Sequence, residues 1–116
     1  MSNFRQIFGI HANEILHNPK YSNWRCIEPG KPGMGIEVFG PDKAGILRTW
    51  RITPTPDYPS SPPTVVAEPV FTDDPCWRNG YLNFNMVPWK RTIDRGVINP
   101  LHELMMELLR KYRAAV

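Results

Sequence analysis

The sequence has few cysteines and no long apolar run, and both absences limit what the protein can be. Its 116 residues include two cysteines, Cys26 and Cys76, and no Cys-x-x-Cys or His-x-x-x-His spacing. We therefore expect neither a disulfide framework nor a metal site. No apolar run approaches the roughly 20 residues that span a bilayer, and the N-terminal residues do not have the form of a secretion signal. We expect a cytoplasmic protein without membrane contact.

Strong net charge is also lacking. The chain has 14 basic and 11 acidic residues, a formal charge of +3. Basic residues gather near the end, at Arg110, Lys111 and Arg113, where they suit the C-terminal end of a helix. A nucleic-acid surface needs more positive charge spread along one face. We expect no nucleic-acid partner and no cofactor.

Proline is plentiful, with 13 residues gathered mostly in the middle of the chain. Tyrosine, tryptophan, phenylalanine and β-branched residues are interleaved with these prolines. This mixture is not typical of a low-complexity linker. It predicts a rigid, ordered surface that joins short strands.

Hydrophobic periodicity predicts one α+β domain over residues 1–116. An apolar stripe predicts a helix over 3–17, ended by Asn18 and Pro19, with His11 packed and hydrogen-bonded on the stripe. Alternating segments joined by short turns then predict a four-stranded antiparallel meander, with strands at 23–28, 34–40, 46–53 and 64–68. We expect Cys26, inside the first strand, to pack in the core.

A second helix is predicted near the end of the chain, after a long irregular segment. Asn99 is a good N-cap and Pro100 suits the first helical position. A complete apolar stripe follows, made of Leu101, Leu104, Met105, Leu108, Leu109 and Tyr112. We expect both helices to pack on the sheet.

The middle of the chain resembles the ubiquitin-conjugating enzyme (E2, UBC-like) superfamily. That family shows a Gly-Pro ending its second strand, then a third strand rising into a Tyr-Pro-x-x-Pro-Pro loop. Gly40-Pro41 and the stretch from Tyr58 to Pro63 fit that pattern. Farther on, the family has Asn-Gly before its catalytic cysteine and a tryptophan before a crossing helix, similar to Asn79-Gly80 and Trp89 here. The resemblance implies a UBC-like fold.

The same resemblance places Asn83 where the family carries its thioester cysteine. An asparagine amide is not a nucleophile at neutral pH, whereas a thiolate is. Asp73, Asp74 and Pro75 stand in place of the family's His-Pro-Asn triplet. The sequence ends at Val116, so we expect the family's terminal helices to be absent. Together these departures resemble an inactive E2 variant (UEV), an RWD-like protein or a divergent prokaryotic E2-like protein.

Cys76 is the alternative nucleophile. It lies in the loop just before the Asn-Gly turn, and in the ubiquitin-conjugating fold that loop is close to the catalytic position. Asp73 and Asp74 are near it in sequence, and neighbouring carboxylates disfavour a thiolate. The competing interpretation is a loop cysteine that packs near Trp77. The two aspartates could form an acid/base couple, although adjacent acids before a proline more often cap a turn.

Aromatic residues around this segment are candidates for binding a partner, because aromatics are enriched at interface hot spots. We expect Trp89 in the core and Trp77, in a polar loop, at an interface. Tyr81 and Asn83 are further binding candidates, as are Asp73 and Asp74. The turn at 28–35 matches, by position only, the first hairpin with which UEV-type proteins contact ubiquitin.

Three functions remain open at this stage. The first is a non-catalytic adaptor, a pseudoenzyme that binds a ubiquitin-like protein or an E1-like or E2-like enzyme. The second is an active conjugating enzyme that uses Cys76. The third is a structural subunit of a larger assembly.

Overall fold

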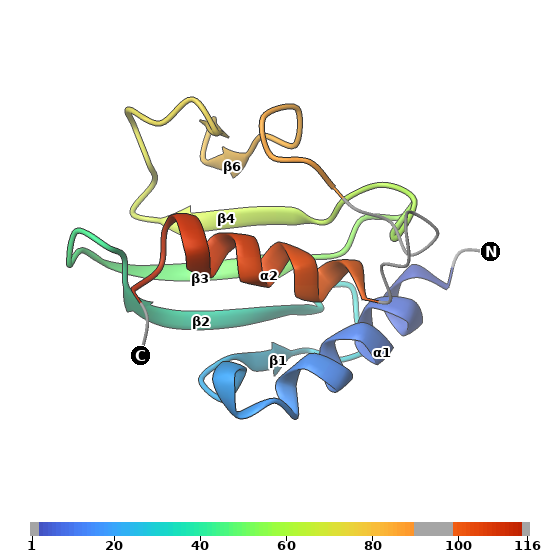
Figure 1. Cartoon of the computed structure of the whole chain (residues 1–116). Coiled ribbons are helices and arrows are strands. Elements are labelled where there is room, and N and C mark those ends of the chain that lie inside the picture. The colour runs from blue at the N-terminus through green and yellow to red at the C-terminus, as the bar shows by residue number, and fades with distance from the viewer. Residues whose placement is uncertain (1–2, 90–98, 115–116) are drawn as a thin grey trace.

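Two helices and a six-stranded antiparallel sheet make up the computed structural model, which describes residues 3–89 and 99–114 (Figure 1). In chain order the elements are α1 (Phe4–Leu16), η1 (Pro19–Tyr21), β1 (Arg25–Ile27), β2 (Gly35–Pro41), β3 (Leu47–Thr53), β4 (Thr64–Glu68), β5 (Trp77–Arg78), β6 (Tyr81–Leu82) and α2 (Pro100–Lys111). The α+β class expected from the sequence is therefore confirmed.

The first four strands pair in chain order, as the meander predicts. Side-chain alternation decides which face each residue serves, because successive residues of a strand point to opposite faces. In β3, Arg48, Trp50 and Ile52 are buried, while Leu47 is 56% exposed. Trp50 pairs with Val38 on one side and with Ala67 on the other, so the buried face continues across the sheet.

The prediction of only four strands is wrong. The hairpin β5–β6 lies in the segment expected to be irregular, and β6 adds to the edge of β4 through the pair Val66 and Tyr81. The strand order becomes β1-β2-β3-β4-β6-β5. Each added strand has only two residues. A strand this short shows no alternation of apolar and polar residues by which the sequence could reveal it.

Side chains from both helices form one side of the hydrophobic core. Figure 1 shows α2 lying over β3, between β4 and β2, with α1 lying nearer to β1. Asn99 caps α2, since its side chain accepts from the N–H of His102 at 3.2 Å. The predicted stripe of α2 is largely buried, with Leu101 and Met105 fully inaccessible. In α1 the fully packed residues are Phe8, Ala12 and Ile15.

The prediction that Cys26 packs in the core is wrong. Cys26 pairs with Ile36, which is fully buried, but Cys26 itself is exposed. The reason is its place on β1, the edge strand, where α1 does not cover it. It lines an apolar groove with Ala12, Leu16 and Met34.

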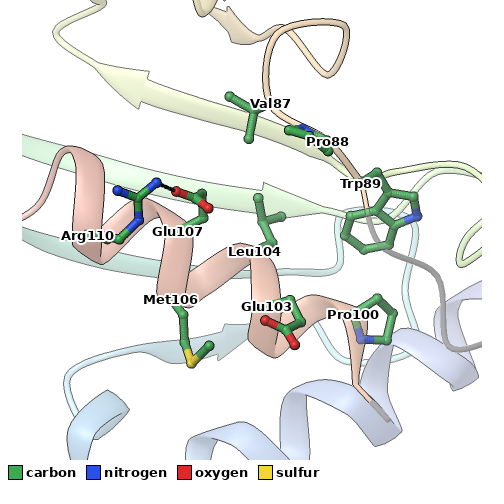
Figure 2. A pocket seen from close by; sticks show the side chains of 9 residues that line it. All are labelled: Val87, Pro88, Trp89, Pro100, Glu103, Leu104, Met106, Glu107 and Arg110. Carbon is green, nitrogen blue, oxygen red and sulfur yellow. Dashed lines mark hydrogen bonds and ion pairs between the residues drawn. The ribbon is translucent and has the colours of Figure 1, made fainter. Parts of the chain in front are cut away.

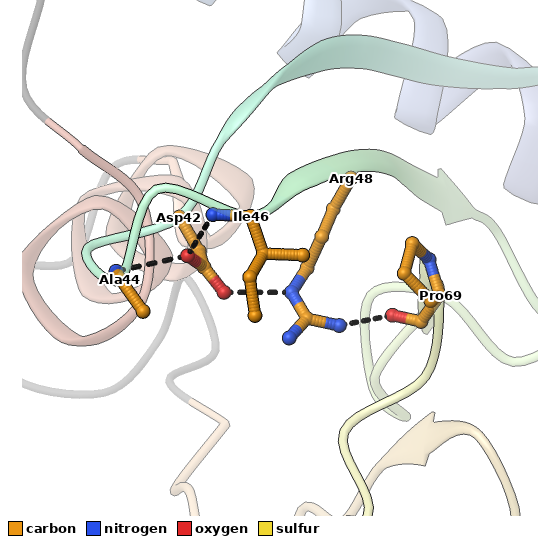
Figure 3. A network of polar contacts seen from close by, with 5 residues as sticks. All are labelled: Asp42, Ala44, Ile46, Arg48 and Pro69. Atoms are coloured by element: carbon orange, nitrogen blue, oxygen red, sulfur yellow. Dashed lines mark hydrogen bonds and ion pairs between the residues drawn. The ribbon is translucent and has the colours of Figure 1, made fainter.

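A buried ion pair joins β3 to the turn between β2 and β3. Arg48 Nε lies 2.8 Å from Asp42 Oδ2, and both side chains are over nine-tenths buried (Figure 3). Asp42 Oδ1 also accepts the N–H groups of Ala44 and Ile46, each at 2.9 Å. Arg48 donates onward to the carbonyl of Pro69.

The turn that carries Asp42 holds the end of α2 in place. Asp42 forms an isolated antiparallel bridge with Arg113. The N–H of Lys43 donates to the carbonyl of Tyr112 at 2.9 Å, and the N–H of Ala114 donates to Pro41 at 3.1 Å. The Asp42–Arg48 pair therefore fixes the turn on which α2 ends. Neither of the two helices described is long and apolar enough to cross a membrane.

Candidate functional site

The hairpin β5–β6 positions the segment that the sequence singled out. Asn79 and Gly80 form its two-residue turn with φ angles of 54° and 84°. Positive φ at both central positions is the condition for a type I′ turn, for which Asn-Gly is the preferred pair. Trp77 pairs with Leu82 across the hairpin. The next residue along, Asn83, is thereby brought opposite Cys76.

Asn83 is half-buried and is used to build a turn. Its N–H donates to the carbonyl of Cys76 at 2.7 Å, which closes the hairpin. Its side-chain Oδ1 accepts the N–H of Asn85 at 3.0 Å, and its carbonyl accepts from Met86 and Val87. Asparagine suits this position because its side chain can mimic a backbone turn. The residue supplies no nucleophile.

Cys76 is half-buried and faces the end of α2. Burial raises the pKa of Tyr112, and the Cys76 thiol and the Asp74 carboxylate raise it further. The Tyr112 hydroxyl is thus a protonated neighbour of the thiol. A neutral phenol does not stabilise a thiolate as a cation does.

The two aspartates have different surroundings. Asp74 Oδ1 accepts the N–H of Cys76 at 2.8 Å, and its carbonyl accepts the N–H of Trp77 at 3.1 Å. Asp73 is exposed. Asp74 therefore caps a turn, which was the simpler of the two interpretations of this acidic pair.

The prediction that Trp77 lies at an interface is wrong. Trp77 is 6% exposed and stacks on Phe71 with ring centroids 5.0 Å apart. Edge contacts to Trp50 and Tyr112 complete an aromatic cluster beneath α2. The cause is strand alternation, because Trp77 points toward the helices from β5. Tyr81, whose position in β6 points it the other way, is 52% exposed and keeps its place as a binding candidate.

Trp89 is half-buried at the rim of the core, where we expected a core residue. Its indole Nε1–H donates to the carbonyl of Pro59 at 2.9 Å. Its ring lies 5.9 Å from that of Tyr58 and 6.1 Å from that of Phe84. Trp89 thus connects the segment after Asn83 to the proline-rich loop at 54–63.

Tyr58 anchors that proline-rich loop. It is 3% exposed, the Tyr58–Pro59 peptide bond is cis, and its ring contacts Phe8 edge-on at 5.4 Å. Its hydroxyl lies 2.6 Å from His11 Nδ1. Burial raises the pKa of Tyr58 and lowers the pKa of His11, although Glu14 opposes the latter shift. The Tyr58 hydroxyl and the neutral His11 ring are therefore hydrogen-bonded to each other, which confirms the packed, hydrogen-bonded histidine.

A cavity of about 200 Å³ lies between α2 and the segment that follows Asn83 (Figure 2). Val87, Pro88 and Trp89 come from that segment, and α2 contributes the remaining side chains. Glu107 and Arg110, which line it, form an ion pair. Among the described residues, the lining holds no cysteine, serine or histidine, and its acidic side chains are Glu103 and Glu107. The sequence carries no signal for this cavity, because the helix positions that line it form no motif.

The turn between β1 and β2 is exposed, as a contact surface must be. Residues 28–32 are all exposed, and Gly30 has φ of 76°. Within the described parts of the chain, no three histidine, cysteine, aspartate or glutamate side chains are placed to hold a metal ion. Comparison with protein-family models, with curated proteins and with solved structures found no match for this chain.

Proposed function

We propose that the protein is a non-catalytic, E2-like adaptor that binds a ubiquitin-like protein. The observation that carries the proposal is that Asn83, which the resemblance matches to the family's thioester cysteine, forms a turn with its side chain and backbone. An asparagine amide is not a nucleophile at neutral pH, so Asn83 cannot carry an acyl group as a thioester. What remains is a rigid frame that can bind.

The order and placement of the elements support an E2-like frame. Gly40 and Pro41 end β2, and β3 leads into the loop at 54–63 that Tyr58 anchors. The strand β4 follows, and α2 crosses the sheet after the Asn79-Gly80 hairpin (Figure 1). Aromatic and proline packing around Tyr58 makes the loop stiff, and a stiff surface loses little entropy on binding.

The turn at 28–35, in which residues 28–32 are exposed, is the first surface to test for ubiquitin contact. Titrating isotope-labelled protein with ubiquitin and following the backbone amide signals measures this directly. We expect saturable shifts in the amides of that turn. Lys31→Ala should weaken binding severalfold, because it removes an exposed cation at the centre of the turn.

Arg78→Ala is the matched control, since it removes an exposed cation from β5, a strand at the far edge of the sheet from β1. It should leave the affinity for ubiquitin unchanged. Shifts that are absent from the turn, or equal weakening by both variants, would count against this surface.

One observation favours the second candidate, a conjugating enzyme that uses Cys76. The 2.7 Å hydrogen bond between the Asn83 N–H and the Cys76 carbonyl holds the cysteine directly across the hairpin from Asn83, the residue that the resemblance equates with the thioester cysteine. Alkylation of the native protein at pH 7 distinguishes the candidates. The adaptor proposal expects the half-buried Cys76 to react more slowly than a free thiol and than exposed Cys26. Faster alkylation of Cys76 supports the enzyme instead.

A further inference from the structure

A pocket lies between η1 and the C-terminal end of α2, on elements distinct from the β5–β6 hairpin. It has a volume of about 290 Å³, near the lower end of the usual range for small-molecule sites. Its lining consists of Pro19, Lys20, Ser22, Asn23, Trp24, Leu109 and Arg113. Two of these residues are cations, and none is an acid.

Arg113 is the central residue of this pocket. Its side chain is 6% exposed, and among the residues that the structure describes it has no carboxylate partner. Its guanidinium carbon lies 5.2 Å from the centroid of the Trp24 ring. Burial lowers its pKa, yet a guanidinium stays protonated at neutral pH. A buried cation with no opposite charge is costly unless a ligand compensates it.

Three buried polar atoms in this region find no hydrogen-bond partner among the described residues: Tyr21 Oη, Trp24 Nε1 and Arg113 Nε. All three can donate a proton. Tyr21 is close enough to Arg113 for the two groups to interact electrostatically. Burial raises the pKa of Tyr21, so its hydroxyl keeps its proton. Two of these donors, Trp24 Nε1 and Arg113 Nε, belong to residues that line the pocket. Buried donors in native proteins nearly always have a protein, ligand or water partner.

The C-terminal end of α2 would by itself repel an anion, because the helix dipole is negative there. Several carbonyls at this end are already used. The carbonyl of Leu108 accepts from Tyr112 and Arg113, and that of Tyr112 accepts from Lys43. The side chain of Lys43 donates to the carbonyl of Arg110. The positive charges of Arg113 and Lys20 therefore dominate the pocket.

We propose that this pocket binds a small phosphomonoester, with the phosphate on Arg113, Lys20 and the Trp24 indole. A phosphomonoester carries about −1.5 to −2 charges at pH 7, which matches the two cations better than a single carboxylate does. Its oxygens can accept from several converging donors, as Arg, Lys and indole N–H supply here. Trp24, Pro19 and Leu109 provide apolar contact for the organic part.

The test is a titration of the labelled protein with inorganic phosphate, following the indole N–H signals. We expect a saturable shift of the Trp24 indole. The indoles of Trp50 and Trp77, also buried and unpartnered but not in the pocket lining, should stay in place. Phosphoserine should bind at least as tightly as phosphate, because its organic part reaches the apolar wall.

Variants separate a built site from general attraction to a basic protein. Lys20→Gln should weaken phosphate binding about two- to fivefold, as for an exposed charge contact. Trp24→Phe, which keeps the ring but loses the donor, should weaken it about two- to tenfold. Arg113→Gln should weaken it more than tenfold if the variant folds. If Arg113→Gln does not fold, Lys20→Gln and Trp24→Phe keep the test valid.

Lys31→Gln is the matched control, because it removes one exposed lysine charge away from the pocket. It should bind phosphate as the unmodified protein does. The proposal is overturned by a Trp24 signal that phosphate does not shift, or by equal weakening in Lys20→Gln and Lys31→Gln. It is also overturned if acetate saturates the same signal at the same concentration.

Discussion

At the scale of single residues, side-chain direction decides what the aromatic residues of the β5–β6 hairpin do. Trp77 fills the cluster beneath α2, whereas Tyr81 stands on the opposite face. We predict that Trp77→Ala lowers the free energy of unfolding by about 3–5 kcal/mol, as for large core aromatics. Tyr81→Ala should change it by less than about 1 kcal/mol. Urea unfolding measures both, and similar losses would refute the assignment of faces.

His11 predicts a pH dependence of stability. Burial holds its pKa below the ordinary value of 6.5, so the folded state prefers the neutral ring that accepts from Tyr58. The contribution of His11 to the free energy of unfolding is therefore complete above about pH 6.5. It is lost as pH falls through the lower pKa that His11 has in the folded state. His11→Gln should flatten the decline in unfolding free energy between pH 7.5 and pH 5.

The exposed His17 provides the control, because His17→Gln should leave that slope unchanged. A wild-type slope that survives in His11→Gln would show that the ring of His11 is not responsible.

At the scale of elements, Asn99 joins the two helices. Its Oδ1 caps α2, while its amide Nδ2 donates to the carbonyl of His11 and to Glu14 Oε2 at 3.0 and 3.1 Å. We predict that Asn99→Ala lowers the free energy of unfolding by about 1–2 kcal/mol, as for a lost N-cap. Asn99→Asp keeps the cap but loses both donors and places a charge beside Glu14. It should remain less stable than the native protein. If Asn99→Asp leaves the free energy of unfolding unchanged, the hydrogen bonds from Asn99 to α1 do not hold the two helices together.

The Asp42–Arg48 pair is a second element-scale test. Burial raises the pKa of Asp42, but hydrogen bonds from Arg48, Ile46 and Ala44 outweigh this and lower it below its ordinary value. Asp42→Asn leaves Arg48 buried without a counter-charge, which should cost about 3–5 kcal/mol at pH 7. Because the pKa of Asp42 is depressed in the folded state, the difference in free energy of unfolding between the native protein and Asp42→Asn should shrink as pH falls below about 4.

Glu37→Gln is the comparison, since it breaks an ion pair with Arg25, whose side chain is 76% exposed. An exposed pair contributes about 0–1 kcal/mol. Chemical unfolding at pH 7 and at pH 3 measures both variants. Equal losses for the buried and the exposed pair would contradict the role given to Asp42.

Local patterns predict those elements that have length or caps. The strand β4 matches its predicted range of 64–68, and α2 begins where Asn99 and Pro100 indicate. The two-residue strands β5 and β6 exist because β4 offers a free edge, and only the folded chain shows that edge. The sequence predicts that Cys26 is a core residue, but its strand lies at the edge of the sheet.

At the scale of the whole molecule, the candidate site was predictable only where it depends on neighbours in sequence. The Asn-Gly turn and the turn-capping use of the aspartate pair follow from local chemistry. The burial of Trp77 and the meeting of Arg113 with Trp24 depend on residues far apart in the chain. No spacing rule connects such residues, so folding alone brings them together.

The most direct test of the adaptor proposal is a charging assay with ubiquitin-activating enzyme, ATP and ubiquitin, resolved on a non-reducing gel. The native protein and Cys76→Ser are assayed beside an active conjugating enzyme, which shows that the reagents work. We predict no ubiquitin adduct on either form, because Asn83 has no thiol to accept the acyl group. An adduct on the native protein that reducing agent removes, and that Cys76→Ser lacks, would contradict the account and establish Cys76 as a working nucleophile.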